Sequence, residues 1–237
     1  MDNLDSVVGD LVIANRILAQ QGVLDAYGHV SVRHPKRPDR FLIARSRSPE
    51  LVEESDIGEY HLSGELVQQD GRRSYIERYI HAGIYEARPD VIAVVHSHAD
   101  DTLPFTITKE PLRPVIHNAS RMGLQVPVWD IRDAFGDTNL LVSNIAQGRD
   151  LARVLAQNSV VLMRGHGFAV AGRNLIEVVG LSVFVPKNAR VLMNALRLGP
   201  VTALSAGELE QIHHGPRPYD WARAWEYWSR RAGLGER

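Results

Sequence analysis

The spacing of apolar positions predicts helices near both ends of the chain and in its middle. Residues 4–21 carry apolar side chains at helical intervals, and a glycine ends this stretch. Residues 74–88 place a second apolar stripe on one helix face, and a proline stops it. Asn174 is expected to cap a long helix that runs to about residue 198. Further helices are expected over residues 150–157 and in the segment that holds Trp221, Trp225 and Trp228.

Short β-branched stretches between these helices predict a sheet. The expected strands cover residues 30–33, 41–45, 91–98, 159–163 and 168–171, with shorter ones at 115–118 and 125–129 and a hairpin at 60–67. Strands and helices interleave without regular βαβ alternation, which favours an α/β protein of the α+β type. We expect one domain over residues 1–237, with a helical tail from about residue 205.

The composition narrows the classes of function. The 237 residues include 27 basic and 28 acidic ones, a near-neutral balance that argues against nucleic acid or an anionic membrane as a partner. There is no cysteine, which excludes a disulfide framework, a thiolate zinc site and a cysteine nucleophile. The acidic first residues are not a secretory signal, and no apolar run reaches the roughly 18 residues that span a bilayer. We therefore expect a soluble, cytoplasmic protein.

Three of the ten histidines form a candidate metal site. His96 and His98 stand two residues apart on an expected strand, so both rings point to one face and can close on one divalent ion. The alternative is a pair of half-exposed polar residues at a strand end. His166 stands between two glycines at a tight turn, where the backbone can approach a bound group closely. Three neutral imidazoles leave open coordination positions, which is typical of a catalytic metal.

The sequence leaves the role of Glu77 open. Ser74-x-x-Glu77 matches a capping box, in which the glutamate satisfies only a backbone N–H. The same carboxylate could instead face the metal, as a ligand or as an acid/base group. Arg45, Ser46 and Arg47 follow an expected strand, where they could hold a substrate carboxylate or form a solvated turn.

Five segments of the chain carry a specific combination of motifs. They are Gly28-His29-Val30-Ser31-Val32-Arg33, Glu77-x-x-x-His81, Arg88-Pro89-Asp90, Val94-Val95-His96-Ser97-His98 and Met163-Arg164-Gly165-His166-Gly167. In this order and spacing, from about residue 5 to 200, the chain resembles the class II aldolase/adducin family. The resemblance implies a central mixed, mainly antiparallel sheet flanked by helices. It also implies an acid/base role for Glu77, a divalent cation on His96, His98 and His166, and a homotetramer with active sites at subunit interfaces.

Departures from the family pattern bear on the substrate. The sugar-phosphate aldolases that the chain resembles hold a phosphate with Gly-Asn, Thr-Gly and Ser-Ser pairs. The corresponding residues here are His29, then Ser46-Arg47, then Tyr75-Ile76. Most of the phosphate cradle is therefore absent, and two arginines flank the serine, which suits a planar carboxylate.

Further motifs are similar to those of a branch that decarboxylates hydroxylated aromatic dicarboxylates. They include Leu112-Arg113-Pro114-x-x-His117 and Asp130-Ile131-Arg132. Branch substrates include 3-hydroxy-2-methylpyridine-4,5-dicarboxylate, from vitamin B6 degradation, and 3,4-dihydroxyphthalate. The resemblance thus implies a carboxy-lyase with one divalent metal ion per subunit, for which Mn²⁺ is preferred and Zn²⁺, Fe²⁺ or Co²⁺ are alternatives. The expected substrate-binding residues are His29, Arg45, Ser46, Arg47 and His117.

Other functions share parts of this pattern. A metal-dependent retro-aldolase acting on a non-phosphorylated hydroxy-acid would use the same metal and glutamate. An oxygenase could hold iron on the same three histidines. An adducin-like interaction domain would keep the fold without the chemistry, although retention of the histidines and Glu77 argues against it. The three C-terminal tryptophans are expected to dock on the protein's own core, and the alternative is a segment that closes over a neighbouring active site.

Overall fold

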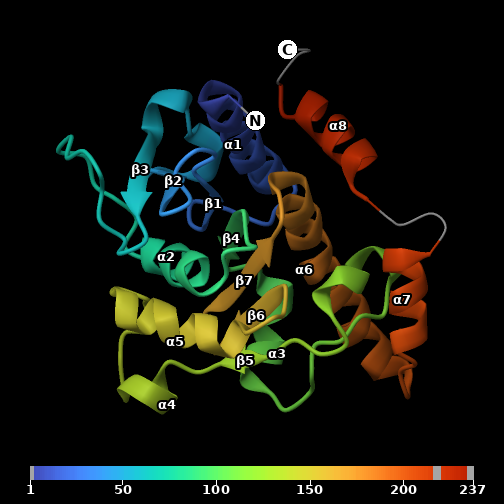
Figure 1. Cartoon of the computed structure of the whole chain (residues 1–237). Coiled ribbons are helices and arrows are strands. Elements are labelled where there is room, and N and C mark those ends of the chain that lie inside the picture. The colour runs from blue at the N-terminus through green and yellow to red at the C-terminus, as the bar shows by residue number, and fades with distance from the viewer. Residues whose placement is uncertain (1–2, 216–219, 234–237) are drawn as a thin grey trace.

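A seven-stranded sheet forms the centre of the molecule (Figure 1). The computed structural model describes residues 3–215 and 220–233. The strands are β1 His29–Arg33, β2 Arg40–Ala44, β3 Ile57–His61, β4 Ala93–Ser97, β5 Val128–Trp129, β6 Val160–Met163 and β7 Gly167–Gly172. Their order is β3-β2-β1-β4-β7-β6-β5, and every neighbouring pair is antiparallel except β5 and β6. The expected mixed, mainly antiparallel sheet is confirmed.

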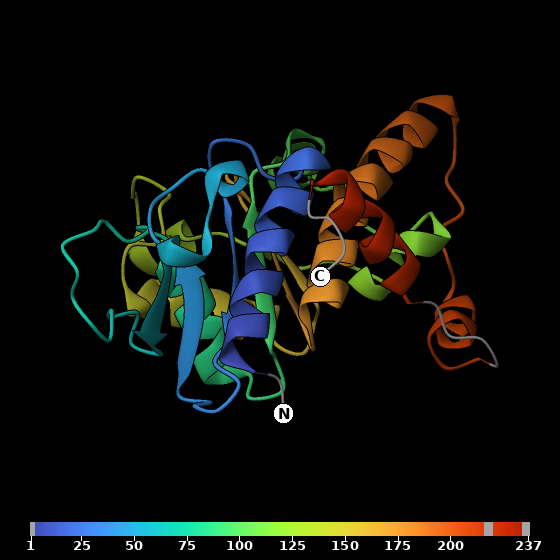
Figure 2. The same ribbon diagram turned by 90° about the horizontal axis from the view of Figure 1, so that it is seen from above.

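Alternate side chains of the strands contribute to two hydrophobic cores, one on each face of the sheet. In β4, Ala93 and Val95 pack in one core, whereas Val94 packs in the other. The first core is covered by α1 (Leu4–Gln20) and α6 (Leu175–Leu198), and the second by α2 (Arg78–Ala87) and α5 (Ile145–Leu155). The sheet therefore lies between two layers of helices, and the C-terminal part of α6 extends beyond it (Figure 2).

The helices α2 and α5 touch each other backbone to backbone. A Cβ atom built on Gly148 of α5 would overlap the carbonyl oxygen of Tyr79 in α2. One built on Gly83 of α2 would overlap the carbonyl group of Gly148. Only residues without a side chain permit this approach, which fixes the position of α2 against the rest of the protein.

Short helices and turns complete the described part of the chain. They are α3 Leu103–Ile107, α4 Arg132–Phe135, α7 Ala206–His214, α8 Ala222–Arg231 and the 3₁₀ helices η1 Pro49–Leu51, η2 Glu54–Asp56, η3 Asp100–Thr102 and η4 His117–Met122. The tail expected from about residue 205 thus contains α7 and α8. Within residues 3–215 and 220–233, none of the helices is both long enough and apolar enough to cross a membrane.

The C-terminal tryptophans pack inward. Trp221 and Trp228 are buried in the core on the α1 and α6 face, and Trp225 packs against that core while partly buried. The contacts of α8 with α1 and α6 place the helix on this chain's own core. The first of the two expectations for this segment is therefore confirmed.

Two predicted β segments differ from the structure. Residues 115–118 form no strand, because Asn188 Oδ1 of α6 accepts the backbone N–H groups of Val115 at 2.8 Å and Ile116 at 3.2 Å. A side chain thus takes the place of a neighbouring strand. The hairpin at residues 60–67 is present but short. Tyr60 and Leu66 form one bridge, and the N–H groups of His61 and Val67 donate to the carbonyl oxygens of Glu65 and Glu59, each at 2.9 Å, on the edge of β3 that β2 does not occupy.

Two predicted helices begin at other residues. The helix predicted from residue 74 begins at Arg78, because Ser74 instead forms an antiparallel bridge with Arg45. The helix predicted at residues 150–157 begins five residues earlier, at Ile145. Its N-cap is Asn144, whose side chain accepts the backbone N–H of Gln147 at 3.1 Å.

Candidate metal centre

Four side chains from three parts of the chain converge at the end of β4. His96 lies in β4, His98 just after it, His166 in the turn between β6 and β7, and Glu77 immediately before α2. Because β7 pairs with β4, the β6–β7 turn comes to lie beside the end of β4. One nitrogen or carboxylate oxygen from each of the four residues lies within 4.8 Å of the others. The structure therefore brings together the three histidines singled out from the sequence and adds Glu77.

Backbone carbonyl groups orient two of the rings. His96 Nδ1 donates to the carbonyl oxygen of Phe168 at 3.0 Å, and His166 Nδ1 donates to that of Leu140 at 2.9 Å. A proton on Nδ1 leaves the Nε2 lone pair of each ring directed at the centre of the group. His98 completes the arrangement, with its Nε2 2.9 Å from that of His96 and 3.1 Å from that of His166.

These separations suit a bound cation. Nitrogen lone pairs that face one another at such distances repel unless a proton or a metal ion lies between them. With bonds of about 2.1 Å, neighbouring ligands of a metal ion are about 3.0 Å apart in octahedral and about 3.4 Å apart in tetrahedral coordination. The two nitrogen separations, and the 3.4 Å and 3.3 Å from Glu77 Oε2 to His96 and His166, fall in this range. Imidazole and carboxylate groups together bind divalent transition metals, so the four residues can hold one such ion.

Glu77 faces the histidines and does not cap a helix. No side-chain capping bond is present at the start of α2, so the capping-box interpretation is wrong. Its Oε1 accepts the backbone N–H of Val142 at 3.1 Å, which leaves Oε2 toward His96 and His166. Burial by itself would raise the pKa of the Glu77 carboxyl, but the contacts with His166 and His96 lower it well below its usual range. The carboxyl is therefore ionised.

The histidines respond to the same surroundings in different ways. Burial, with the neighbouring His96 and His166, lowers the pKa of His98 to about 4, so this ring is neutral. Burial also acts to lower the pKa of His166, but the hydrogen bond and charge of Glu77 outweigh it and raise that pKa. A cation at this site would compete with protons for the ring nitrogens, so metal binding should weaken as the pH falls.

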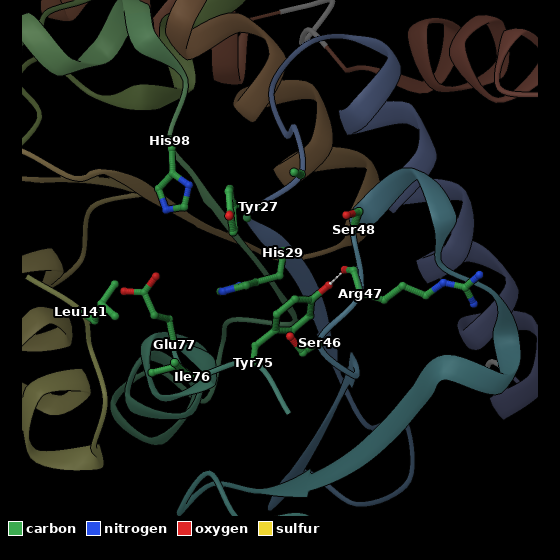
Figure 3. Close-up of a pocket in the computed structure, with 12 residues that line it drawn as sticks. Tyr27, His29, Ser46, Arg47, Ser48, Tyr75, Ile76, Glu77, His98 and Leu141 are labelled. Carbon is green, nitrogen blue, oxygen red and sulfur yellow. Dashed lines mark hydrogen bonds between the residues drawn. The ribbon is translucent and has the colours of Figure 1, made fainter. Parts of the chain in front are cut away.

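A cavity of about 370 Å³ lies beside the group, and Glu77 and His98 are the two of its four residues that line the cavity (Figure 3). Glu77, His98 and His29 point into the same space, and Tyr75 lies along its side. Carbon-rich side chains form much of the remaining lining, among them Tyr27, Ile76 and Leu141. A cavity of this size and character suits a small ring with a few polar substituents.

The arginines near the cavity are engaged elsewhere. Arg47 Nη1 and Arg45 Nε each donate to the buried Asp56 carboxylate at 2.6 Å. The Arg47 side chain leads away from the cavity, although the residue contributes to its lining (Figure 3). The Tyr75 hydroxyl donates to the backbone carbonyl of Arg47 and so fixes this corner of the lining.

The comparison with protein families accounts for the arrangement of fold and site. Residues 9–193 match the family described as the class II aldolase and adducin N-terminal domain. The chain belongs to the class II aldolase and adducin family. The match covers most of the chain and includes the four residues of the metal centre, so the resemblance stated from the motifs is confirmed.

Relatives within this family include decarboxylases. Decarboxylase tropJ of Talaromyces stipitatus is 35% identical over 92% of this chain and 91% of its own length. The 3,4-dihydroxyphthalate decarboxylase of Arthrobacter keyseri is 26% identical over 80% of this chain and 78% of its own length. Among solved structures, an L-fuculose 1-phosphate aldolase shares the fold, with a TM-score of 0.74, 22% identity, and coverage of 90% of this chain and 96% of that one.

The expected substrate-binding residues of this family member divide into two groups. His29, Ser46 and Arg47 line the cavity, whereas Arg45 and His117 are not among its lining residues. His117 instead begins η4, with its Nδ1 3.3 Å from Asn118 Oδ1.

Sequence reasoning named Tyr75 only as a departure from the aldolase phosphate pairs, and it missed the other residues that shape the site. Tyr75 lines the cavity, Asp56 holds both arginines, and the backbone of Leu140 and Val142 holds His166 and Glu77. Asp56 follows Arg45 and Arg47 at a short distance in the sequence, but spacing alone does not reveal an ion pair.

Proposed function

We propose that this protein is a divalent-metal-dependent decarboxylase of a hydroxylated aromatic dicarboxylate. The observation that carries the proposal is a centre of three histidines and Glu77 that opens on a cavity sized for one substituted ring. Decarboxylases among its relatives support the same reaction class, and one of them is named for a dihydroxylated benzene dicarboxylate. In this class the chain is a carbon–carbon lyase.

Direct loss of CO₂ from an aromatic ring would leave an unstabilised aryl anion, so the ring carbon has to be protonated first. A cation held by His96, His98 and His166 would act as a Lewis acid toward the substrate's adjacent hydroxyl and carboxylate oxygens. Glu77 Oε2 accepts the proton that the substrate hydroxyl releases on binding and passes it to the ring carbon that bears the carboxylate. The bond from that carbon to the carboxylate then breaks, CO₂ leaves, and the bonding electron pair restores the aromatic ring.

The contacts of Glu77 suit this transfer. Its Oε1 is held by Val142, so Oε2 is the oxygen that faces the three histidines and the reacting atoms. The residue is largely buried, so a ring that fills the cavity would displace most of the water near its carboxylate. Its carboxylate lines the cavity, so it can reach a ring bound there.

The cavity lining favours a carboxylated ring over a phosphorylated sugar. The positions that correspond to the aldolase phosphate pairs hold His29, Ser46, Arg47, Tyr75 and Ile76, and all five line the cavity. Two aromatic rings and an isoleucine replace small hydroxyl and amide groups, so the space beside the metal centre is better matched to a flat ring.

The test is direct. Purified protein loaded with Mn²⁺ is incubated with 3,4-dihydroxyphthalate and, separately, with 3-hydroxy-2-methylpyridine-4,5-dicarboxylate, while CO₂ release and product mass are followed. We expect metal-dependent CO₂ release with one of the two rings and none after treatment with a chelator. Absence of CO₂ from both rings, with metal bound, would refute the proposal and direct the search to retro-aldol cleavage of hydroxy-acids.

Two finer features are part of the proposal. We propose Mn²⁺ as the working ion, and metal analysis with reconstitution by Mn²⁺, Zn²⁺, Fe²⁺ and Co²⁺ tests it by ranking turnover. We propose a homotetramer with active sites at subunit interfaces, which light scattering on the eluting protein tests through its molar mass against the 26.4 kDa chain. A monomer with full turnover would contradict the second of these.

A further inference from the structure

The turn that carries His166 is supported from outside the sheet. It joins β6 to β7, and Gly165 in this turn donates its backbone N–H to Thr106 Oγ1 at 3.0 Å. Thr106 lies in α3 and is buried. Its hydroxyl is the one hydrogen-bond partner that Gly165 has within residues 3–215 and 220–233. Thr106 does not line the cavity, so its contact acts on the turn and not on a bound substrate.

The direction of this hydrogen bond is fixed by the atoms that form it. A backbone N–H can only donate, so Thr106 Oγ1 is the acceptor. The hydroxyl proton is donated to the carbonyl oxygen of Leu103 at 2.8 Å, within the same helix. One hydroxyl group thus joins α3 to the His166 turn, and the contact does not depend on a protonation state or a tautomer.

The position of the turn decides how close His166 comes to His98. The turn lies directly against the end of β4, because a Cβ atom built on Gly167 would overlap the carbonyl oxygen of Ser97. The other neighbour of His166 in the chain, Gly165, is held by α3. Between these two supports, His166 Nε2 lies 3.1 Å from that of His98. This separation therefore depends on α3 as well as on the sheet.

The helix α3 also follows His98 closely in the chain. His98 comes directly after β4, and only η3 lies between it and α3. From His98 the chain therefore runs through η3 and α3 to the turn of His166, where Thr106 makes its contact. Because α3 links the two segments that carry His98 and His166, loss of this contact would let the two rings move apart.

We propose that Thr106 is a positioning residue of the metal centre, which by accepting the Gly165 N–H holds His166 Nε2 within reach of a cation shared with His98. This inference rests on the proposed function, because it takes the centre of three histidines and a glutamate as the site of the metal ion. Threonine suits the role, since one hydroxyl accepts from the turn and donates to its own helix. Serine keeps both bonds, whereas valine has nearly the shape of threonine and can form neither.

The contact can be observed without metal or substrate. Arg164-Gly165 is the one Arg-Gly pair in the sequence. Protein labelled with ¹³C in its arginine carbonyl groups and ¹⁵N in its glycines therefore gives a single carbonyl-to-amide NMR correlation, that of Gly165. We expect hydrogen exchange of this amide to be slowed in the wild type and to be about tenfold faster in Thr106→Val, as for loss of one hydrogen bond. An unprotected Gly165 amide in the wild type would overturn the proposal.

The effect on the metal centre is measured with a matched pair of variants. Dissociation constants for Zn²⁺ and Mn²⁺ are determined by competition with a chelator for the wild type, Thr106→Val and Thr106→Ser. Loss of an outer contact of a metal site typically weakens metal binding by about 10- to 100-fold. Because Thr106 acts through the turn, we expect about tenfold weakening in Thr106→Val and less than about threefold in Thr106→Ser. Unchanged affinity in Thr106→Val, or equal losses in both variants, would refute the positioning role.

Thr102 provides a control for the loss of a buried hydroxyl. It is buried like Thr106, and its Oγ1 donates to the carbonyl oxygen of Ala99, three residues earlier, at 2.8 Å. In the described part of the chain, its hydroxyl accepts no backbone N–H from another segment. Thr102→Val should therefore keep metal affinity and Gly165 exchange within about threefold of the wild type. A loss equal to that of Thr106→Val would show a general effect of removing a hydroxyl and would overturn the proposal.

Failure of the proposed function would look different. If the wild type binds metal more tightly than Thr106→Val but releases no CO₂ from either ring, the decarboxylase proposal fails and the role of Thr106 stands. If Thr106→Val binds metal as tightly as the wild type and CO₂ is released, the role of Thr106 fails and the decarboxylase proposal stands. If the wild type binds neither Zn²⁺ nor Mn²⁺, the positioning role is overturned, whatever the exchange rate of Gly165.

Discussion

Gly148 lies where α5 meets the backbone of α2, so a single methyl group there is expected to destabilise the protein. A Cβ atom at this position would overlap the carbonyl oxygen of Tyr79 and lie 2.9 Å from its carbonyl carbon. Real Cβ atoms do not approach other heavy atoms within 3.0 Å, and a backbone carbonyl in a helix cannot rotate away. Gly148→Ala therefore forces the two helices apart.

The size of the effect follows from the required movement. Restoring ordinary carbon–oxygen contact requires the helices to separate by roughly 1 Å, which weakens the dispersion contacts along their shared face by a quarter to a half. Overpacking of this kind typically costs about 1–3 kcal/mol, and the gain in helix propensity on replacing glycine by alanine returns less than about 1 kcal/mol. We expect a net loss of about 1–3 kcal/mol, or roughly 3–10 °C in Tm for a chain of this length.

Gly207 provides a matched control. It lies in α7, where a Cβ atom would meet only Ser205 Oγ at 3.9 Å, so Gly207→Ala is expected to stabilise the protein slightly. Thermal and urea unfolding of both variants, with metal content measured alongside, separate a packing effect from a general effect of the substitution. If Gly148→Ala is as stable as the wild type or as Gly207→Ala, the backbone contact between α2 and α5 does not support the fold as described.

Three further substitutions test the site and its surroundings. His96→Ala should lose bound metal and turnover together, as measured by metal analysis and CO₂ release, and a variant that keeps both would exclude His96 as a ligand. Glu77→Gln should remain folded and lower kcat by about 10²–10⁴-fold, the usual effect of removing a general acid/base group, whereas near-normal turnover would exclude proton transfer by Glu77. Asp56→Asn should cost about 1–3 kcal/mol at pH 7, because Arg45 and Arg47 lose a charged acceptor. Burial acts to raise the pKa of Asp56, but its hydrogen bonds lower that pKa overall. The stability lost in Asp56→Asn, measured by urea unfolding, should therefore be fully present above the ordinary pKa of a carboxyl group and vanish as the pH falls through the lowered pKa of Asp56. A loss of stability that persists in acid would contradict the assignment.

Sequence patterns were sufficient for the parts of the fold that depend on local periodicity. The stripe of α1 and the capped start of α6 follow from apolar spacing and from Asn174, because these helices bury one face on a sheet. The inward-facing tryptophans follow the same rule. Patterns failed where one distant group replaced a local partner, as when Asn188 took the N–H groups of residues 115 and 116. A capping motif failed similarly, because Ser74 was drawn into a bridge with Arg45.

In the candidate site, too, local patterns predicted some residues, whereas the roles of others depend on partners that are distant in the sequence. His96, His98 and His166 could be predicted because a strand fixes the directions of side chains two residues apart and a glycine-flanked turn can bring a third ring close. The partner of Arg47 could not be predicted, because its charge suits a substrate carboxylate and a carboxylate of the protein itself equally well. Only the fold shows that Asp56, at the end of η2, is near enough to engage it.

The supports of the metal centre are hidden from sequence for a more general reason. Leu140 accepts from His166, and Val142 donates to Glu77, through backbone atoms that every residue except proline possesses. The backbone conformation of Leu140 is unusual. Its φ of 66° is a left-handed value that costs a leucine about 1–3 kcal/mol and persists only where the surrounding structure holds it. In this protein one short segment holds the Glu77 carboxylate by an N–H and His166 by a carbonyl, two residues apart. Because these contacts are made by main-chain atoms, the role of the segment depends on its path through space and becomes visible only once the fold is known.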